Sequence, residues 1–188
     1  MTNTREIVSR CLQNDAAAQK QLYQHYAPQM LALCYRYTKD AHEASDVLQE
    51  GFVRVFRNLQ QWKQEGELGA WIRRIMVNAA LNWLRDHRRM KLTEEAHIPE
   101  NHDASSVITP IQEMEARQLA ELIRQLPDGY QTVFNLHAIE GYSHVEIAKM
   151  LKLSEGTCRS QYMRARKCLI DLITQSQQIK KEFYAGKP

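Results

Sequence analysis

The sequence predicts an all-α protein made of two small helical domains joined by a flexible linker. Apolar residues recur at helical spacing over most of the 188 residues, and no pair of strand-like patterns appears. Between residues 90 and 108 this periodicity fails, and acidic residues, serines and a proline take its place. We therefore expect a first domain over 1–90, a linker over 91–109, a second domain over 110–175 and a frayed tail over 176–188.

Composition and charge limit the possible classes of function. Hydrophobic residues make up 44% and charged residues 25%, as in an ordinary globular protein, and the net charge is only +3. Any affinity for nucleic acid must therefore come from local basic patches. No apolar run reaches the roughly 18–20 residues that cross a bilayer, and the start MTNTREIVSR has no signal-peptide core. We expect a cytoplasmic protein with no membrane insertion.

The four cysteines, Cys11, Cys34, Cys158 and Cys168, lie inside helical patterns without CxxC spacing. They are expected to be packed thiols rather than disulfides or zinc ligands. A Gly-rich phosphate loop, a metal cluster and a nucleophile triad are also missing from the sequence. An enzyme is therefore the least supported class, and we expect neither a cofactor nor a metal.

The first domain should begin with three helices. The first two are expected over 4–13 and 16–37, and Pro28 should kink or split the second because it removes a backbone donor. The third is expected over 40–59, where an apolar stripe runs through Ala44, Val47, Leu48, Phe52, Val55 and Phe56. Its outer face carries an acidic row, which we define as Glu43, Asp46 and Glu50 with Gln49 beside them. Most such rows are solvated faces, and composition alone does not make this one a docking site.

A polar loop, QQWKQEGELG, follows over 60–69 and contains Trp62 and Lys63. Trp62 has two interpretations: a lid over the core, or a surface on which another ring stacks. Spacing alone favours the lid.

The fourth helix is expected over 70–89, with Trp71, Ile72, Ile75, Met76, Ala79 and Trp83 facing the core. On its other side a stripe repeats at spacings of four, three, four and three, formed by Arg74, Asn78, Leu81, Arg85 and Arg88. Such a stripe can follow a phosphate backbone, but a solvated arginine face fits the pattern equally well.

The second domain should start at Thr109-Pro110, which suits a helix N-terminus. One helix follows, Pro127-Asp128-Gly129 turns the chain, and a helix over 130–139 ends at Gly141. The stretch 142–169, YSHVEIAKMLKLSEGTCRSQYMRARKCL, then has the form of a helix-turn-helix. Ser143 and Glu146 form a capping-box pattern for its first helix, and Ser154 suits the N-cap of the second.

The second of these helices should bury Cys158, Tyr162, Ala165 and Leu169. Its opposite face is basic and bears hydroxyl groups, and it carries Gly156, Ser160, Met163, Arg164 and Lys167, flanked by Arg159 and Arg166. This face suits a DNA major groove. The alternative is an ordinary helical hairpin whose basic face is merely solvated.

Two separated stretches resemble one family. DAHEASDVLQEGFVRVFRNL with AWIRRIMVNAALNWLRDHRR (40–59 and 70–89) resembles region two of the extracytoplasmic-function (ECF) sigma factors of bacterial RNA polymerase. LPDGYQTVFNLHAIEGYSHVEIAKMLKLSEGTCRSQYMRARKCL (126–169) is similar to their region four. The resemblance covers nearly the whole chain. It implies a subunit that binds core RNA polymerase, recognises the promoter minus-thirty-five and minus-ten elements and promotes DNA melting, and it allows an anti-sigma factor as a further partner.

The resemblance also implies roles for individual residues. The acidic row, Glu43, Asp46, Gln49 and Glu50, becomes the expected polymerase contact. The expected minus-ten contacts are Asn78 and Asn82, with Trp62 and Lys63 in the loop that holds a flipped base and Arg74, Arg85 and Arg88 along the stripe. For Trp62 this reverses the lid interpretation. The expected minus-thirty-five contacts are Arg159, Ser160, Met163 and Arg164 at base-reading positions, Thr157 near phosphate, and Lys167.

Two departures and two rival functions accompany this hypothesis. The loop WKQEGELG is longer and more acidic than is usual in the family, and Cys158 replaces the usual valine. A stand-alone helix-turn-helix regulator would explain 142–169 but leave the Arg74/Asn78/Arg85 stripe without a role. A sigma-like decoy that only occupies an anti-sigma protein should have lost its DNA-reading side chains, and here they are present.

Overall fold

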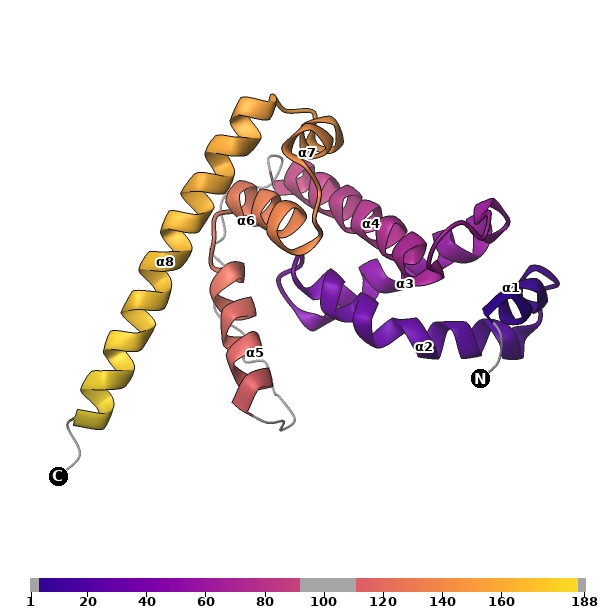
Figure 1. Cartoon of the computed structure of the whole chain (residues 1–188), viewed down its shortest axis with the longest axis horizontal. Coiled ribbons are helices and arrows are strands. Elements are labelled where there is room, and N and C mark those ends of the chain that lie inside the picture. Colours follow the sequence, from indigo (N-terminus) through magenta and orange to yellow (C-terminus); the bar gives the residue numbers. More distant parts are fainter. Residues whose placement is uncertain (1–3, 92–110, 186–188) are drawn as a thin grey trace. The chain divides into compact units, whose positions relative to one another are not determined.

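The computed structural model describes residues 4–91 and 111–185, with side chains over 4–87 and 118–176, and all regular structure in these ranges is helical (Figure 1). The all-α prediction is therefore confirmed. The chain divides after Ser105 into two compact units. Apart from residue 91, the predicted linker over 91–109 lies outside the described residues.

Over its described residues, 4–91, the first unit contains four α-helices: α1 (Thr4–Leu12), α2 (Ala16–Tyr35), α3 (Ala41–Asn58) and α4 (Leu68–Lys91). A short 3₁₀ turn, η1 (Leu59–Gln61), follows α3. Asp15 caps α2 by accepting hydrogen bonds from two first-turn amides, and Asp40 caps α3 by accepting one from Glu43 N. Of the two outcomes expected at Pro28, a kink or a split, the split does not occur, because α2 continues through Pro28 as one helix. The cost of proline is local, and burial of Leu22, Met30 and Leu33 along the helix offsets it.

The fourth helix packs against both α2 and α3. Ile72, Met76 and Ala79 are buried as predicted, but Val77 and Ala80 are also fully buried. A helix with one packed neighbour needs one apolar stripe, whereas a helix between two neighbours buries a wider surface. Close approach to α3 is possible because Gly51 has no side chain where Met76 lies.

The second unit contains α5 (Ile111–Arg124), α6 (Asp128–Phe134), α7 (His144–Leu151) and α8 (Glu155–Ala185). A π-helical turn, η2 (Asn135–Ile139), continues α6. Ile123 of α5 and Leu126, just after that helix, form a buried cluster with Ala165 and Leu169 of α8. The capping box at Ser143 and Glu146 is confirmed, since each residue's side chain bonds the other's backbone amide.

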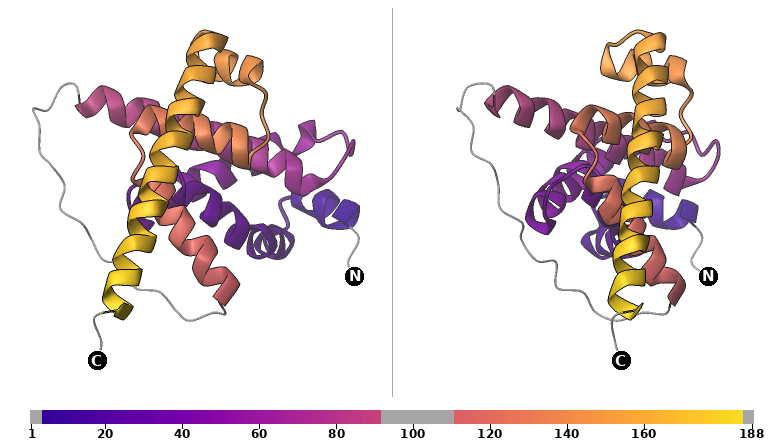
Figure 2. Two further views of the ribbon diagram at one scale, coloured as in Figure 1. Left: turned by 60° about the vertical axis from the view of Figure 1, so that its left-hand side comes forward. Right: turned by 90° about the vertical axis from the view of Figure 1, so that its left-hand side faces the viewer.

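Two features of this unit differ from the sequence predictions. The helix after Gly129 ends in the π turn, where Glu140 N donates to Asn135 O at 2.9 Å. Just beyond the turn, Tyr142 N donates to Leu136 O, also at 2.9 Å. The regular structure also does not end near residue 175, because α8 runs on to Ala185 past α6 and α7 (Figure 2). Frayed ends are a general tendency of chain termini, and here helical hydrogen bonding continues.

Candidate functional site

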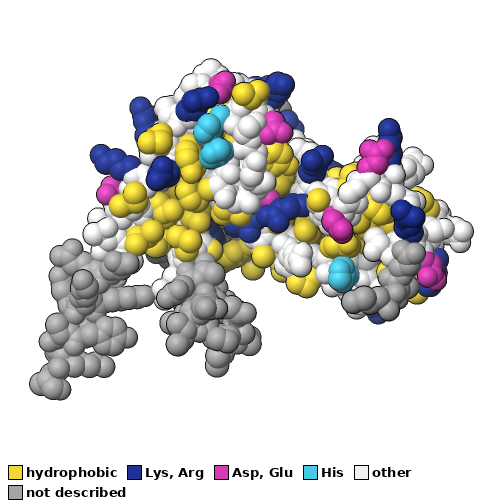
Figure 3. Space-filling view, viewed as in Figure 1, with side chains coloured by type: hydrophobic (Ala, Val, Ile, Leu, Met, Phe, Trp, Pro, Cys, Tyr) yellow, Lys and Arg dark blue, Asp and Glu magenta, His cyan; other side chains and the backbone are white. Residues whose placement is uncertain are grey.

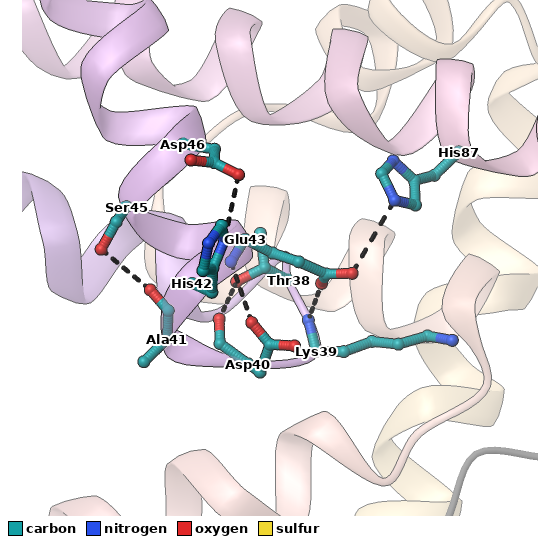
Figure 4. A network of polar contacts seen from close by, with 9 residues as sticks. All are labelled: Thr38, Lys39, Asp40, Ala41, His42, Glu43, Ser45, Asp46 and His87. Atoms are coloured by element: carbon teal, nitrogen blue, oxygen red, sulfur yellow. Dashed lines mark hydrogen bonds and ion pairs between the residues drawn. The ribbon is translucent and has the colours of Figure 1, made fainter.

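Carboxylates of the acidic row on α3 already have partners within the first unit (Figure 4). Glu43 Oε2 accepts a hydrogen bond from Lys39 N at 2.7 Å, and its Oε1 lies 3.8 Å from Nε2 of His87 on α4. The His87 ring in turn stacks on Trp83, with ring centroids 3.9 Å apart. With only 22% of its side chain exposed, Glu43 connects α3 to the segment before it and to α4.

The other members of the row are more accessible. Asp46 lies 3.2 Å from His42 Nδ1, yet its side chain is 60% exposed. Glu50 accepts a 2.9 Å hydrogen bond from Arg54 Nε and is 55% exposed. Gln49 is also exposed. These two carboxylates and one amide can meet a partner without unfolding the helix, whereas Glu43 has mainly an internal role.

The residues of the stripe on α4 differ in their exposure to solvent. Arg74, Asn78 and Arg85 are exposed, and the Arg85 guanidinium lies 3.6 Å from the neighbouring Asp86. Leu81 and Asn82 are half-buried, and the side chain of Arg88 lies outside the described residues. Because the opposite face of α4 is buried, this face can present one amide between two guanidinium groups.

Trp62 belongs to the core rather than to the surface. It is 9% exposed, and its Nε1 has no hydrogen-bond partner among the described residues. The loop beyond it turns through positive φ at Gln64 and Gly66, and Lys63 is exposed. The lid interpretation from the residue pattern agrees with this burial. The resemblance implies instead a surface that holds a flipped base, and this role for Trp62 stays a prediction.

In the second unit, the first part of α8, 155–169, is the candidate recognition helix. Ser154 Oγ accepts from Thr157 N at 3.0 Å and lies 2.8 Å from Thr157 Oγ1, so the helix starts where the sequence predicts. Cys158 and Ala165 are fully buried. The opposite face is exposed and carries Arg159, Ser160, Met163, Arg164 and Lys167. Thr157 is half-buried at its edge.

The two arginines at predicted base-reading positions are held differently. Arg159 donates to Glu155 Oε1 from both Nε, at 3.0 Å, and Nη2, at 2.6 Å. Arg164 Nη1 reaches Tyr130 Oη on α6 only at 3.5 Å, the limit for a hydrogen bond. The sequence pattern identified both arginines and suits Glu155 to the first turn of the helix, but it did not pair Glu155 with Arg159, although their four-residue spacing is typical of a helical ion pair.

A ring cluster not foreseen from the sequence joins the helices of this unit. His137 of η2 and His144 of α7 stack with centroids 4.1 Å apart, and His137 makes an edge contact with Tyr162 of α8 at 4.6 Å. Histidine side chains are seen together on this unit in the space-filling view (Figure 3). Burial lowers the pKa of His144, and charge on His137 and on Arg159 acts in the same direction. The sequence did not predict this cluster, because His137 and His144 are seven residues apart on either side of a turn and match no helical spacing.

Over the described residues, no three His, Cys, Asp or Glu side chains come together as metal ligands would. All four cysteines are free, as predicted, and burial raises the pKa of Cys34 to about 12. Among the helices that the structure describes, none has the length and apolar character needed to cross a membrane.

Comparison with known proteins identifies both units. The family model for Sigma-70 region 2 matches residues 22–90, and that for Sigma-70 region 4 matches 116–169. The ECF RNA polymerase sigma-E factor of Haemophilus influenzae is 31% identical over 173 residues, covering 87% of this chain and 91% of that protein. The chain belongs to the ECF sigma factors. It functions as a sigma factor of RNA polymerase, a DNA-binding regulatory subunit.

Other comparisons agree that this sigma factor belongs to that family. The RNA polymerase sigma-H factor of Pseudomonas aeruginosa is 30% identical over 174 residues, covering 87% of this chain and 90% of that protein. The sigma factor RpoE of Bartonella quintana, solved in complex with the anti-sigma factor NepR, has the same fold. It gives a TM-score of 0.54 at 19% identity, over 82% of this chain and 96% of that one. A stand-alone helix-turn-helix regulator would account for the second unit alone.

Proposed function

We propose that this sigma factor docks on core RNA polymerase with the exposed part of the acidic row, Asp46, Gln49 and Glu50. The exposed fractions of 60% and 55% at Asp46 and Glu50 support this role. A surface that presents carboxylates suits a basic partner surface, and such complementarity governs the rate and orientation of docking. Glu43 contributes by holding α3 in place and not by direct contact.

The stripe on α4 is proposed to bind the opened minus-ten element. Asn78 supplies both an amide donor and an acceptor, while Arg74 and Arg85 on either side can neutralise phosphates. A base leaves the stack only when the strands separate, so binding of the open strand shifts the equilibrium toward melting. Lys63, Asn82 and Arg88 are proposed as further contacts from their sequence positions. The buried Trp62 supports the loop from below.

The recognition helix is proposed to read the minus-thirty-five element in the major groove. Arg159 and Arg164 carry the planar guanidinium that makes two parallel bonds to a guanine edge. Ser160 can contact base edges, and Met163 can contact thymine methyl groups. Thr157 and Lys167 are proposed to contact phosphates. The observation that carries this proposal is that every one of these side chains except Thr157 is exposed on a helix whose other face is buried.

We further propose that the protein acts in the cytoplasm, where RNA polymerase works, and that it performs no catalytic step of its own. An anti-sigma factor is a proposed regulatory partner, supported by the complexes in which proteins of this fold were solved. The domains are proposed to be 1–90 and 110–175, with 91–109 as the linker. Helix α8 continues from the second domain into the C-terminal segment 176–188, as far as Ala185.

The experiment that tests the proposed function is run-off transcription with purified core polymerase on a library of genomic promoter fragments. We expect starts that depend on both the sigma factor and the core enzyme, and the enriched promoters should share two elements. Core polymerase alone is the control. A decoy that only occupies an anti-sigma factor predicts no starts on any fragment, and a stand-alone regulator predicts duplex binding without core polymerase.

A further inference from the structure

The recognition helix contains one contact that its proposed base-reading role does not explain. Both Nε and Nη2 of Arg159 donate to the same carboxylate oxygen of Glu155, one turn earlier on the helix. The pair is well exposed, with 66% of the Arg159 side chain and 41% of the Glu155 side chain accessible. Exposed pairs at this spacing contribute little to stability, so a purely structural role would be a weak one.

The hydrogen-bond geometry divides the guanidinium into two edges. A guanidinium has five N–H groups, and Glu155 occupies the side formed by Nε and one N–H of Nη2. The remaining three N–H groups have no hydrogen-bond partner among the described residues. They include one N–H on each terminal nitrogen, which together form the end-on fork. Two parallel donors of this kind match the O6 and N7 atoms of guanine in the major groove.

We propose that Glu155 is a positioning and specificity-determining residue of promoter recognition. Glu155 acts through Arg159. This role rests on the proposed function, in which Arg159 reads a base pair of the minus-thirty-five element. By engaging the side edge, the carboxylate reduces the rotational freedom of the guanidinium and leaves the end-on fork for guanine. The affinity gained per hydrogen bond is larger when the donor pair is pre-organised.

The same carboxylate should weaken binding to DNA of any sequence. A negative charge in the first turn of a major-groove helix repels nearby phosphates, and it keeps Arg159 from turning aside to contact them. Glu155 therefore lowers non-specific affinity and raises discrimination, which is the combination that a sequence-reading protein requires. Arg164, with its single 3.5 Å contact to Tyr130, has no comparable restraint.

Two other roles for Glu155 make different predictions. As the first residue of α8 it can stabilise the helix N-terminus through the helix dipole. In that case its removal changes thermal stability but not base preference. Alternatively its carboxylate can accept directly from a cytosine amino group, and then its effect on base preference is independent of Arg159.

The test uses holoenzyme reconstituted from core polymerase and full-length sigma factor. The variants are Glu155→Ala, Glu155→Gln, Arg159→Ala and the double variant Glu155→Ala with Arg159→Ala. Competitive binding to a promoter library with a randomised minus-thirty-five element gives the base preference at each position. Non-specific duplex measured at several salt concentrations gives the electrostatic contribution, and thermal unfolding measures the fold.

We expect Glu155→Ala to reduce preference for guanine at one position by about threefold to tenfold, a part of what a lost bidentate pair costs. Its affinity for non-specific duplex should rise, with a salt slope steeper by up to about one. Glu155→Gln should retain most of the preference because its amide oxygen still accepts from Arg159. Arg159→Ala should abolish the same preference, and the double variant should lose no more than Arg159→Ala does.

Arg164→Ala serves as the matched control and should alter a different position. If Arg159→Ala leaves base preference unchanged, the proposed base-reading role fails. If Arg159→Ala relaxes the preference but both Glu155 variants keep it, only the role of Glu155 is overturned. Additive losses in the double variant, or a change in unfolding temperature alone, also overturn the positioning role.

Discussion

The sulfur of Met76 on α4 occupies the space where a Cβ at position 51 of α3 would stand. Gly51 is therefore a contact surface between the two helices and not a flexible point, although glycine inside a helix costs about 1 kcal/mol relative to alanine. Met76 is fully buried, so its sulfur has little room to move aside. This contact holds the acidic row and the α4 stripe at a fixed distance within the first unit.

Gly51→Leu should therefore lower the free energy of unfolding of the first unit by about 1–3 kcal/mol, the usual cost of overpacking. The three tryptophans of the chain are Trp62, Trp71 and Trp83, so their fluorescence reports on this unit alone. Urea titration followed by fluorescence gives the change. Val53→Leu is the control, because Val53 lies on the same helix but is 41% exposed, so the added bulk meets solvent and not the core. An unchanged midpoint for Gly51→Leu would contradict the tight contact.

Trp62 offers a second test of stability. Trp62→Ala removes a large buried side chain and should cost about 3–5 kcal/mol. Trp62→Phe should cost clearly less, because the indole Nε1 makes no hydrogen bond that the change could break. Urea unfolding followed by far-ultraviolet circular dichroism measures both variants. The exposed neighbour Lys63→Ala should stay within about 0.5 kcal/mol of wild type. A Trp62→Ala variant as stable as wild type would mean that the side chain is not part of the core.

The ring cluster makes the stability of the second unit depend on pH. The pKa of His144 is lowered in the folded state, so the unfolded chain binds more protons as the pH falls. The contribution of His144 to stability is thus complete above the unfolded value, about 6.5, and is lost as the pH falls through the lower folded value. We expect the free energy of unfolding, measured by circular dichroism, to decrease as the pH is lowered from about 7.5 into the acidic range.

His144→Gln should reduce that pH dependence, because the titrating group is gone. His42→Gln in the first unit is the matched control and should leave the pH dependence of the second unit as in wild type. Equal pH profiles for wild type and His144→Gln would show that other groups cause the effect.

The sequence was sufficient for features set by local patterns. The capping box at Ser143 and Glu146 and the buried side of α8 follow from spacing within one or two turns. The capping box is confirmed, and so is the burial of the predicted α8 residues except Tyr162, which is half-buried. The order of helices and the two-unit division follow from periodicity and its loss. The exposed positions of Asn78 and Arg164 follow in the same way, because each lies opposite a buried stripe.

What the sequence could not provide depends on neighbours distant in the chain. Val77 is buried because α4 packs between two helices, and its own helix carries no sign of the second neighbour. The stacking of His137 on His144 depends on the π turn, which has no sequence signature that we used. Glu43 was placed in the acidic row because of its helical spacing from the other members. Its internal role is revealed only by its contacts to Lys39 and His87.

The acidic row leads to a test that separates docking from folding. Reversing charge with Asp46→Lys and Glu50→Lys should weaken binding to core polymerase by about tenfold, or 1.4 kcal/mol, while stability changes by only about 0.5 kcal/mol. Glu43→Lys should instead lower the unfolding temperature, because it breaks the contacts to Lys39 and His87. Affinity is measured by titrating labelled sigma factor with core enzyme. Glu6→Lys, an exposed acid on α1, is the control; a core affinity unchanged by the double reversal would exclude docking through the row.

Asn78 leads to a prediction about the opening of DNA. Its exposed amide lies on α4 between Arg74 and Arg85, where it can pair with a base edge only after that base has left the duplex. Asn78→Ala should therefore leave folding, core binding and minus-thirty-five recognition nearly unchanged. Run-off transcription from a closed duplex promoter should fall by about tenfold or more, since an amide paired with a base contributes about 1–3 kcal/mol.

A promoter with a pre-opened bubble at the minus-ten element separates melting from every other step. Because the strands are already apart, Asn78→Ala should recover part of its activity on this template, while wild type changes less. Gln24→Ala, which removes an exposed amide from α2, should behave as wild type on both templates. Equal defects of Asn78→Ala on the closed and the pre-opened promoter would place its role outside melting. Wild-type activity on both would remove Asn78 from the minus-ten surface altogether.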